Sequence, residues 1–271
     1  MVAMKAIWRL PCWLMLLIGA TACIQPEIQT SRLKVLSYNI HHGEGTDGQF
    51  DLERLAALIR AQDADLVALQ EVDQGTERAS GRLQAMELGR LTNMQAVFGK
   101  AMDYQGGAYG EAILSRLPIL ETALQPLPHS AGAEPRAALA VLVQLPDTGP
   151  DLWFVATHLD HLPDDTDRLA QAEEIRRWLV RQGPDAPMIL AGDLNAVPGS
   201  APMQIFEQDW QMADEAFQRP TFPSDQPKLK IDYVLFRPDT HWRVTEIEVV
   251  GESVASDHRP LLVGLEFSGQ P

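Results

Sequence analysis

The chain carries two polar stretches, AGDLN at residues 191–195 and SDHRP at residues 256–260, each beside a short apolar run. Apolar residues 188–191 lead into the first stretch and residues 261–267 follow the second, and both runs have the length and composition of strands. A strand end holds a side chain rigidly while the adjoining loop shapes a pocket around it. The two stretches therefore predict that Asp193, Asn195, Asp257 and His258 lie at a functional site.

Three other predicted strands end in polar residues, in SYN (37–39), LQE (69–71) and ATH (156–158). Taken singly, each has a structural explanation, because Asn39 could cap a turn, Glu71 could be a solvated strand end, and a lone histidine such as His158 is usually a satisfied imidazole. Five strand ends that each deliver an Asn, Asp, Glu or His are hard to explain by turns alone. We therefore expect these side chains to converge.

The rest of the chain alternates β-rich runs with a few amphipathic helices and contains no internal repeat. Helical spacing predicts helices over residues 51–61 and 165–181. Strands are predicted at 33–40, 65–70, 113–114, 119–120, 137–145, 152–157, 188–191, 231–236, 243–250 and 261–267. Because the polar motifs run from residue 39 to residue 258 and must meet, we expect one domain of class α+β. Two mixed β-sheets packed face to face, with helices outside, accommodate this pattern.

The order of the motifs YNI (38–40), QEV (70–72), THL (157–159), GDLN (192–195), IDYV (231–234) and SDHRP (256–260) resembles that of the endonuclease/exonuclease/phosphatase superfamily. Its members resemble pancreatic-type deoxyribonuclease, abasic-site endonucleases, neutral sphingomyelinases and inositol-polyphosphate phosphatases. GDLN and SDHRP are the most specific parts of the match. The resemblance implies a four-layer α/β/β/α sandwich over residues 33–268 that hydrolyses phosphoester bonds.

The resemblance also implies a divalent metal ion, Mg²⁺ or Mn²⁺. Glu71 corresponds to its principal ligand, with Asp257 and Asn39 close by or acting through water. Oxygen ligands of this kind suit Mg²⁺, which takes one or two carboxylates and keeps several waters.

The remaining motif residues receive catalytic roles from the same resemblance. Asp193 would align and deprotonate the attacking water, and Asn195 would donate to the transition state. His258 would face the phosphate, with Asp232 accepting its other ring N–H. His158 would face it from the opposite side, either as a second donor to the substrate or as the general acid for the leaving group.

Arg136 and the loop HHGEG (41–45) are further candidates. Arg136 begins a predicted strand, where it could be a solvated cation, but arginine suits a phosphate and we expect it to contact the substrate. Paired histidines beside Glu44 could indicate a zinc site. The chain has no helical HExxH spacing, so we favour a glycine-containing loop that supplies backbone N–H groups or space for the substrate.

The first 23 residues have the features of a bacterial lipoprotein signal. Lys5 and Arg9 precede an apolar run, which ends in ATAC at residues 20–23. An uncleaved anchor helix is the alternative, although the apolar run is short for a membrane span. We expect cleavage before Cys23, lipidation of that cysteine, and residues 24–32 as a tether. The protein would then be exported to the periplasm or cell envelope and anchored to the membrane through Cys23.

The formal net charge of −15 disfavours a dedicated nucleic-acid binder, because such proteins carry basic surfaces. The favoured function is hydrolysis of a phosphodiester or phosphomonoester, on a lipid head group or another small phosphoester, by a monomeric enzyme. A nuclease is the alternative among enzymes. A non-catalytic binding module on the same fold is a more distant alternative, since such a module should have lost at least one catalytic position and the motifs above are complete.

Overall fold

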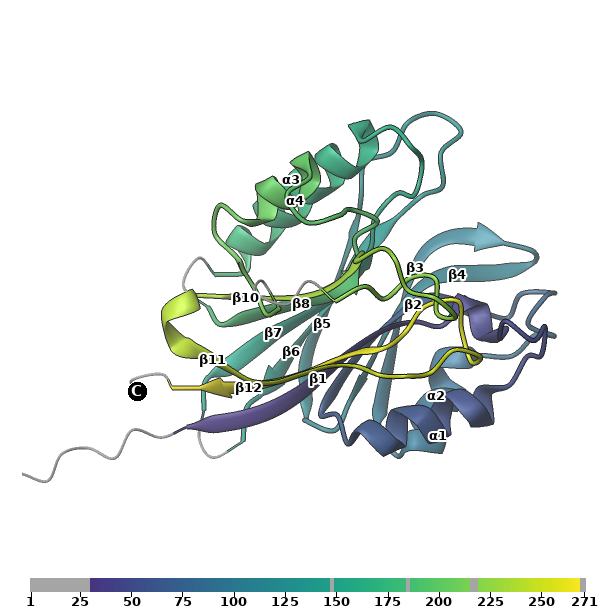
Figure 1. Cartoon of the computed structure of the whole chain (residues 1–271), viewed down its shortest axis with the longest axis horizontal. Coiled ribbons are helices and arrows are strands. Elements are labelled where there is room, and N and C mark those ends of the chain that lie inside the picture. Colours follow the sequence, from purple (N-terminus) through teal and green to yellow (C-terminus); the bar gives the residue numbers. More distant parts are fainter. Residues whose placement is uncertain (1–29, 147–148, 184–185, 215–218, 269–271) are drawn as a thin grey trace, which may run out of the picture.

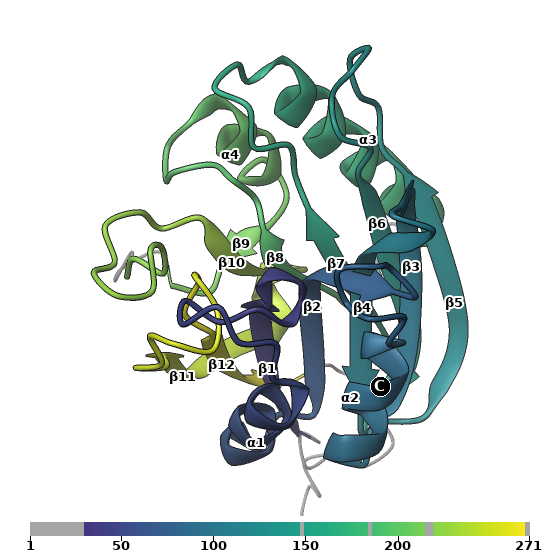
Figure 2. The same ribbon diagram turned by 90° about the vertical axis from the view of Figure 1, so that its right-hand side faces the viewer.

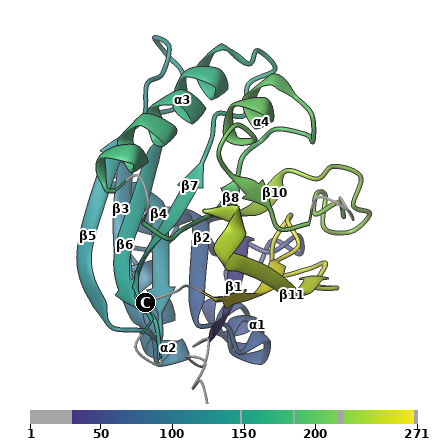
Figure 3. The same ribbon diagram turned by 90° about the vertical axis from the view of Figure 1, so that its left-hand side faces the viewer.

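The computed structural model describes residues 30–146, 149–183, 186–214 and 219–268. Two six-stranded sheets pack face to face, with α1 and α2 outside one sheet and α3 and α4 outside the other (Figure 1). The same order of layers is visible from two other sides (Figure 2 and Figure 3). The predicted four-layer α/β/β/α sandwich is therefore confirmed.

The helices are α1 (Leu52–Gln62), α2 (Gln84–Thr92), α3 (Thr166–Arg181) and α4 (Ala201–Phe206). The strands are β1 (Ser31–Asn39), β2 (Leu66–Gln74), β3 (Gln95–Tyr104), β4 (Gly107–Ser115), β5 (Ile119–Pro126), β6 (Ala137–Gln144), β7 (Asp151–His158), β8 (Met188–Asp193), β9 (Gln211–Met212), β10 (Asp232–Arg237), β11 (Trp242–Val249) and β12 (Leu261–Phe267).

Each sheet contains one parallel pair among antiparallel neighbours. The strand orders are β11-β12-β1-β2-β4-β3 and β5-β6-β7-β8-β10-β9, and the parallel pairs are β1/β2 and β7/β8. Parallel neighbours need a crossover connection, which α1 and α3 provide. Because the strands of a parallel pair run in the same direction, their C-terminal ends lie at the same edge of the sheet.

Helix α1 illustrates how the sequence sets these elements. The Asp51 side chain caps the helix by accepting a hydrogen bond from the Arg54 backbone N–H at 2.9 Å, and the helix ends where Asp63 adopts a left-handed conformation. Its apolar residues recur at helical spacing and are buried against the first sheet: Leu52, Leu55, Ala56 and Ile59. Their burial, at roughly 1.5–3 kcal/mol for each large apolar side chain, fixes the helix to the sheet.

Several elements were not predicted from the sequence, notably α2, β3, α4 and most of β4. Helix α2 is short, contains Gly89 and lacks a side-chain N-cap, so its start carries no signal. Gly110 interrupts the pattern of β4 because an added Cβ there would lie 2.0 Å from the Gly99 carbonyl oxygen. The two backbones approach so closely there that only glycine fits, and glycine weakens the sequence pattern of a strand.

The predicted signal and most of the tether lie outside the described residues. Strand β1 begins at Ser31, two residues before the predicted start of the domain at residue 33. Among the residues that the structure describes, no helix is long and apolar enough to cross a membrane.

Candidate active site

The parallel strand pairs bring the predicted residues to one edge of the sandwich. In the second sheet, His158 at the end of β7 is the register partner of Asp193 at the end of β8. Asp232, the first residue of antiparallel β10, is the other register partner of Asp193. In the first sheet, Asn39 ends β1 next to Gln70 of β2, and Glu71 follows directly. Strand register therefore groups three of these residues in one sheet and two in the other, and a hydrogen bond from the Asn39 amide to Asp193 joins the two groups.

The SDHRP segment reaches the same edge because it precedes β12, which runs antiparallel to β1. The Ser256 hydroxyl donates to the Asn39 carbonyl oxygen at 2.7 Å, and this buried contact attaches the segment to the end of β1. Asp257 and His258 then both face the pocket.

A pocket of about 420 Å³ occupies this edge. All the predicted site residues line it except Asn39 and Asp232, which are buried and contact lining residues. The lining comprises His41, His42, Glu71, Arg78, Met102, Tyr104, Tyr109, Glu134, Arg136, His158, His161, Asp193, Asn195, Phe222, Asp257 and His258.

Asp193 lies at the centre of the buried polar network. Its Oδ2 is 3.5 Å from His258 Nε2 and 3.4 Å from His158 Nε2. The Asn195 backbone N–H donates to Asp193 Oδ1 at 2.9 Å, and the Asn39 amide donates to Oδ2 at 3.2 Å. The carboxylate is thus held from several directions, as a group that must position a water requires.

His258 is held in a charged state. Its Nδ1 donates to Asp232 Oδ2 at 2.9 Å, and Asp232 Oδ2 also accepts a hydrogen bond from the Thr221 hydroxyl at 2.5 Å. Burial lowers the pKa of His258, but the negative charges of Asp232 and Asp193 outweigh it and raise the pKa to about 10. Burial raises the pKa of Asp193 to about 7, against the opposing charge of His258. The pair can therefore combine a base that ionises near neutrality with a stable imidazolium.

His158 is in the opposite protonation state. Burial, followed by the positive charge of Arg136, lowers the pKa of His158 well below 6.5. Arg136 Nη1 donates to His158 Nδ1 at 2.9 Å, and because arginine can only donate, the proton of the neutral ring lies on Nε2. This Nε2 is 3.4 Å from Asp193 Oδ2 and 3.0 Å from the Asn195 amide nitrogen, which itself donates to the Leu159 carbonyl oxygen. A neutral ring with Nε2–H toward the pocket suits the predicted role of donor better than that of general acid.

Arg136 lies behind His158, with 2% of its surface exposed. Its guanidinium contacts His158, pairs with Glu134 at 3.0 Å and lies 3.2 Å from His161 Nδ1. Although Arg136 lines the pocket, its hydrogen bonds orient the histidines around it. Direct contact with a phosphate remains a prediction.

Two residues of the site, one on the side of each sheet, have unusual backbone conformations. Glu71 lies in a β-bulge of β2 with φ of 58°, and Asn195, which donates to the Leu159 carbonyl at 3.1 Å, has φ of 46°. Positive φ in such residues costs on the order of 1–3 kcal/mol each and is concentrated at functional sites. The bulge turns the Glu71 carboxylate into the pocket, where the Asn39 amide donates to it at 3.0 Å.

Glu71 is suited to hold a cation. Burial alone would raise the pKa of Glu71, but the His42 imidazole beside it, followed by His158 and the Asn39 amide, lowers the pKa below its usual range. The Asn39 amide oxygen accepts from the His41 backbone N–H at 3.0 Å, so in this structure Asn39 presents its nitrogen to Glu71. Asp257 lines the same pocket.

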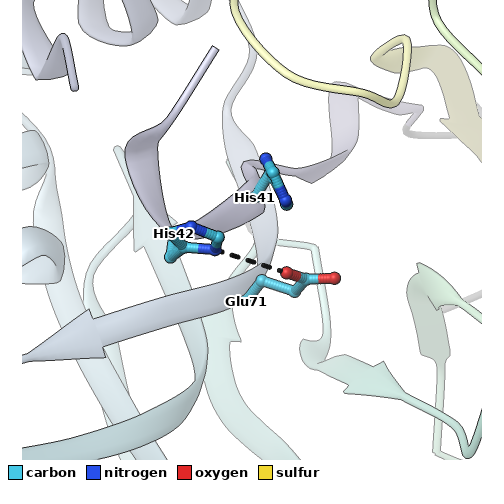
Figure 4. Close-up of side chains that lie close together, drawn as sticks. All are labelled: His41, His42 and Glu71. Atoms are coloured by element: carbon cyan, nitrogen blue, oxygen red, sulfur yellow. Dashed lines mark ion pairs between the residues drawn. The ribbon is translucent and has the colours of Figure 1, made fainter. Parts of the chain in front are cut away.

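Two groups of side chains among the described residues have the composition and spacing of a metal site: His41, His42 and Glu71, and Asp193, Asp232 and His258. The second group is engaged in its own ion pairs. In the first, both imidazoles of the HHGEG loop gather at Glu71 (Figure 4). The sequence interpretation of this loop, as a source of backbone N–H groups or space, did not include this contact between its side chains and Glu71.

Sequence reasoning also missed one wall of the pocket, which contains Arg78, Tyr104 and Tyr109. The Arg78 guanidinium lies 4.6 Å from the centre of the Tyr104 ring and 5.4 Å from that of Tyr109, and it pairs with the buried Asp73 at 2.7 Å. The tyrosines belong to β3 and β4, strands that the sequence showed poorly. Only knowledge of these strands could have identified this wall.

The sequence profile of the Endonuclease/Exonuclease/phosphatase family matches residues 36–258, and the chain belongs to this family. Members of the family are hydrolases that act on phosphoesters. The recognition made from the motifs is thereby confirmed.

Relatives of known sequence or structure agree with this assignment. The uncharacterized protein YbhP of Escherichia coli is 28% identical over 248 residues, which cover 87% of this chain and 96% of YbhP. A functionally unknown conserved protein of Enterococcus faecalis has a similar structure, with a TM-score of 0.73, 24% identity, and coverage of 86% of this chain and 99% of its own. A mannosyl-6-phosphatase of Bacteroides thetaiotaomicron has a TM-score of 0.70 and 22% identity, with coverage of 86% of this chain and 99% of its own. At these identities the two structures show a shared fold.

Proposed function

We propose that the protein is an exported, divalent-metal-dependent hydrolase of phosphoester bonds that acts on a small substrate. The observation that carries the proposal is the arrangement around Asp193, whose carboxylate faces a charged His258 and a neutral His158 in one pocket. Glu71 supplies an ionised carboxylate in the same pocket. A base, two donors and a cation ligand are the parts that phosphoester hydrolysis needs.

In the proposed mechanism Asp193 accepts a hydrogen bond from a water molecule and takes its proton as the water attacks phosphorus in line with the leaving oxygen. The bond between phosphorus and the leaving oxygen breaks, that oxygen takes a proton from solvent water, and Asp193 returns its proton to the solvent. The His258 imidazolium and the His158 Nε2–H donate to the non-bridging oxygens, where negative charge accumulates, and Asn195 donates beside them. A divalent cation held by Glu71, with Asp257 and Asn39 nearby, supplies charge neutralisation at the phosphate when bound. Asp232 keeps His258 charged and oriented throughout.

The pocket favours a small phosphoester over a nucleic acid strand. Among the described lining residues the two arginines, Arg78 and Arg136, are both paired with carboxylates, and no lysine is present. A strand of nucleic acid requires a groove with free cations that follows its backbone. A lipid head group would be consistent with the anchor proposed at Cys23. The sugar-phosphate substrate class in the name of the Bacteroides relative is a second source of small phosphomonoesters.

A substrate panel tests this proposal. Full-length protein purified in detergent should be assayed with Mg²⁺ or Mn²⁺ against bis-(p-nitrophenyl) phosphate, p-nitrophenyl phosphate, a sugar 6-phosphate, sphingomyelin, phosphatidylinositol, plasmid DNA and RNA, with Asp193→Asn as the control. We expect turnover of at least one small phosphoester that the variant lacks. Turnover of DNA or RNA alone would establish the nuclease alternative, and no turnover of any substrate would favour a binding module.

A further inference from the structure

His42 is one of two histidines in the pocket wall, with His41, to which the proposed mechanism gives no role. It is nine-tenths buried, and its Nε2 lies 3.3 Å from Glu44 Oε2. Because a carboxylate accepts, the proton of the neutral ring lies on Nε2 and the lone pair on Nδ1. That Nδ1 is buried without a hydrogen-bond partner and faces Glu71 Oε2 at 3.8 Å, which is too long for a hydrogen bond. A proton on Nδ1 would form no hydrogen bond at that distance, whereas a cation bound between the two atoms satisfies both the lone pair and the carboxylate.

His41 is oriented in the same way. Its Nδ1 lies 3.0 Å from the Glu44 carbonyl oxygen, so Nδ1 carries the proton and Nε2 is free to accept. Metal-binding histidines nearly always donate their other ring N–H to a carboxylate or a backbone carbonyl. Glu44 provides both partners, its carbonyl to His41 and its carboxylate to His42. One ligand atom from each of His41, His42 and Glu71 lies within 4.8 Å of the others (Figure 4).

The backbone holds this arrangement in a conformation that histidine rarely adopts. His41 and His42 both have φ of 46°, and Gly43 follows with φ of 88°. Gln84 of α2 fixes the turn by donating to the His42 carbonyl oxygen at 2.6 Å while accepting from the Asp73 backbone N–H at 2.9 Å. Backbone strain that neighbouring elements enforce is typical of sites where side chains must be placed for a ligand.

We infer that His41 Nε2 and His42 Nδ1 join Glu71 as ligands of a first-row transition ion, such as Zn²⁺ or Mn²⁺, which the site binds in preference to Mg²⁺. Two imidazoles and one carboxylate form a donor set of borderline softness, whereas Mg²⁺ selects oxygen. The inference rests on the proposed function only in placing a metal ion at Glu71. It adds two nitrogen ligands to the oxygen donors already named and thereby changes which metal the enzyme would use.

Metal binding by the full-length, metal-stripped protein tests the inference without reference to turnover. Mn²⁺-loaded protein should show nitrogen couplings by pulsed electron paramagnetic resonance, and these should change when the histidines are labelled with ¹⁵N. Calorimetry should show Zn²⁺ binding that excess Mg²⁺ does not displace. His41→Ala and His42→Ala should each weaken Zn²⁺ binding by about tenfold or more. His129→Ala is the matched control, because His129 is exposed and contacts the Ser130 carbonyl.

The outcomes separate this inference from the proposed function. Mn²⁺ binding without histidine couplings in the wild type would overturn the two nitrogen ligands and leave a metal-dependent hydrolase with oxygen ligands. Zn²⁺ binding that is equally tight in all three histidine variants would also overturn them. Full phosphoesterase activity in protein that binds neither ion would refute both this inference and the metal dependence in the proposed function. If an alanine variant fails to fold, His41→Gln and His42→Gln replace it, and each should lose the ¹⁵N-dependent coupling of its own imidazole while His258→Gln keeps both couplings.

Discussion

Replacement of Asp232 by Asn should change the pH dependence of catalysis rather than the shape of the site. Asp232 Oδ2 accepts from His258 at 2.9 Å and from Thr221 at 2.5 Å, and its other oxygen, Oδ1, is buried without a partner. An asparagine can retain both accepted hydrogen bonds through Oδ1 and place its amide nitrogen where the free oxygen was. The negative charge beside His258 is then lost.

The expected magnitude follows from the pKa of His258. The carboxylates raise this pKa from 6.5 to about 10 against burial, which lowers it. Without Asp232, burial and the remaining charges of Asp193 and Asp257 oppose one another, and the ordinary value of about 6.5 serves as the working value for the variant. At pH 8 the protonated fraction would then fall from about 99% to about 3%, a loss of about 30-fold in kcat if the imidazolium is the active form. At pH 6 about three-quarters of the rings stay protonated, so the loss should be less than about twofold.

The ion pair should also make stability depend on pH. Because the pKa of His258 is raised by folding, the pair stabilises the fold fully below about pH 6.5, and this contribution is lost as pH rises through about 10. Thermal melts of the wild type and Asp232→Asn should therefore differ most at pH 6 and converge toward pH 10.

The assay is kcat from pH 6 to pH 9 with the substrate that the panel identifies, at saturating metal. Asp160→Asn is the matched control, since Asp160 is equally buried but accepts from the Leu162 backbone N–H at 2.9 Å instead of from a histidine. Its kcat relative to the wild type should be the same at both pH values. The double variant with His258→Ala should be scarcely worse than His258→Ala alone, because the two residues act as one unit. A loss in Asp232→Asn that is equal at pH 6 and pH 8, or that multiplies with His258→Ala, would refute the reasoning.

Three further outcomes are expected. Asp193→Asn should lower kcat by about 10²-fold or more with little change in KM. Wild-type kcat should rise with pH through about 7 as the Asp193 carboxylate forms, and a kcat that stays constant between pH 6 and pH 8 would exclude Asp193 as the base. Exhaustive chelation should abolish activity, and a reconstitution series with added divalent metal should restore it. Unchanged turnover after metal removal would contradict the mechanism. Metabolic labelling with a palmitate analogue should mark the wild type but not Cys23→Ala, and equal labelling of both would remove the proposed anchor.

The sequence predicted the parts of the fold in which burial leaves a regular pattern. Strands β1, β7, β8 and β12 are buried along most of their length, so they read as continuous apolar runs. Strand β3 is only half buried and contains Gly99, whose added Cβ would lie 2.9 Å from the Leu139 side chain. Close packing between the two sheets explains that glycine, and a single sequence does not show such packing.

The same limit applies to the site. Residues in motifs at strand ends, such as Asp193 and His258, were predictable because each motif combines an apolar run with a polar end. The roles of Glu44 and Gln84 depend on a turn of three residues with positive φ, beginning at His41, which neither composition nor spacing indicates. Local strain of this kind is imposed by tertiary contacts and so could be recognised only in the folded structure.

The two parallel strand pairs explain why the chemistry lies between the sheets. Each pair delivers side chains at its C-terminal edge, Asn39 and Glu71 from one sheet and His158 and Asp193 from the other. The Asn39 amide joins the two halves by donating to both Glu71 and Asp193, at 3.0 and 3.2 Å. A cation bound at Glu71 would therefore be coupled to the proposed base through one buried amide. Loss of that amide should therefore impair both cation binding at Glu71 and proton transfer to Asp193, although Asn39 lies behind the pocket and does not line it.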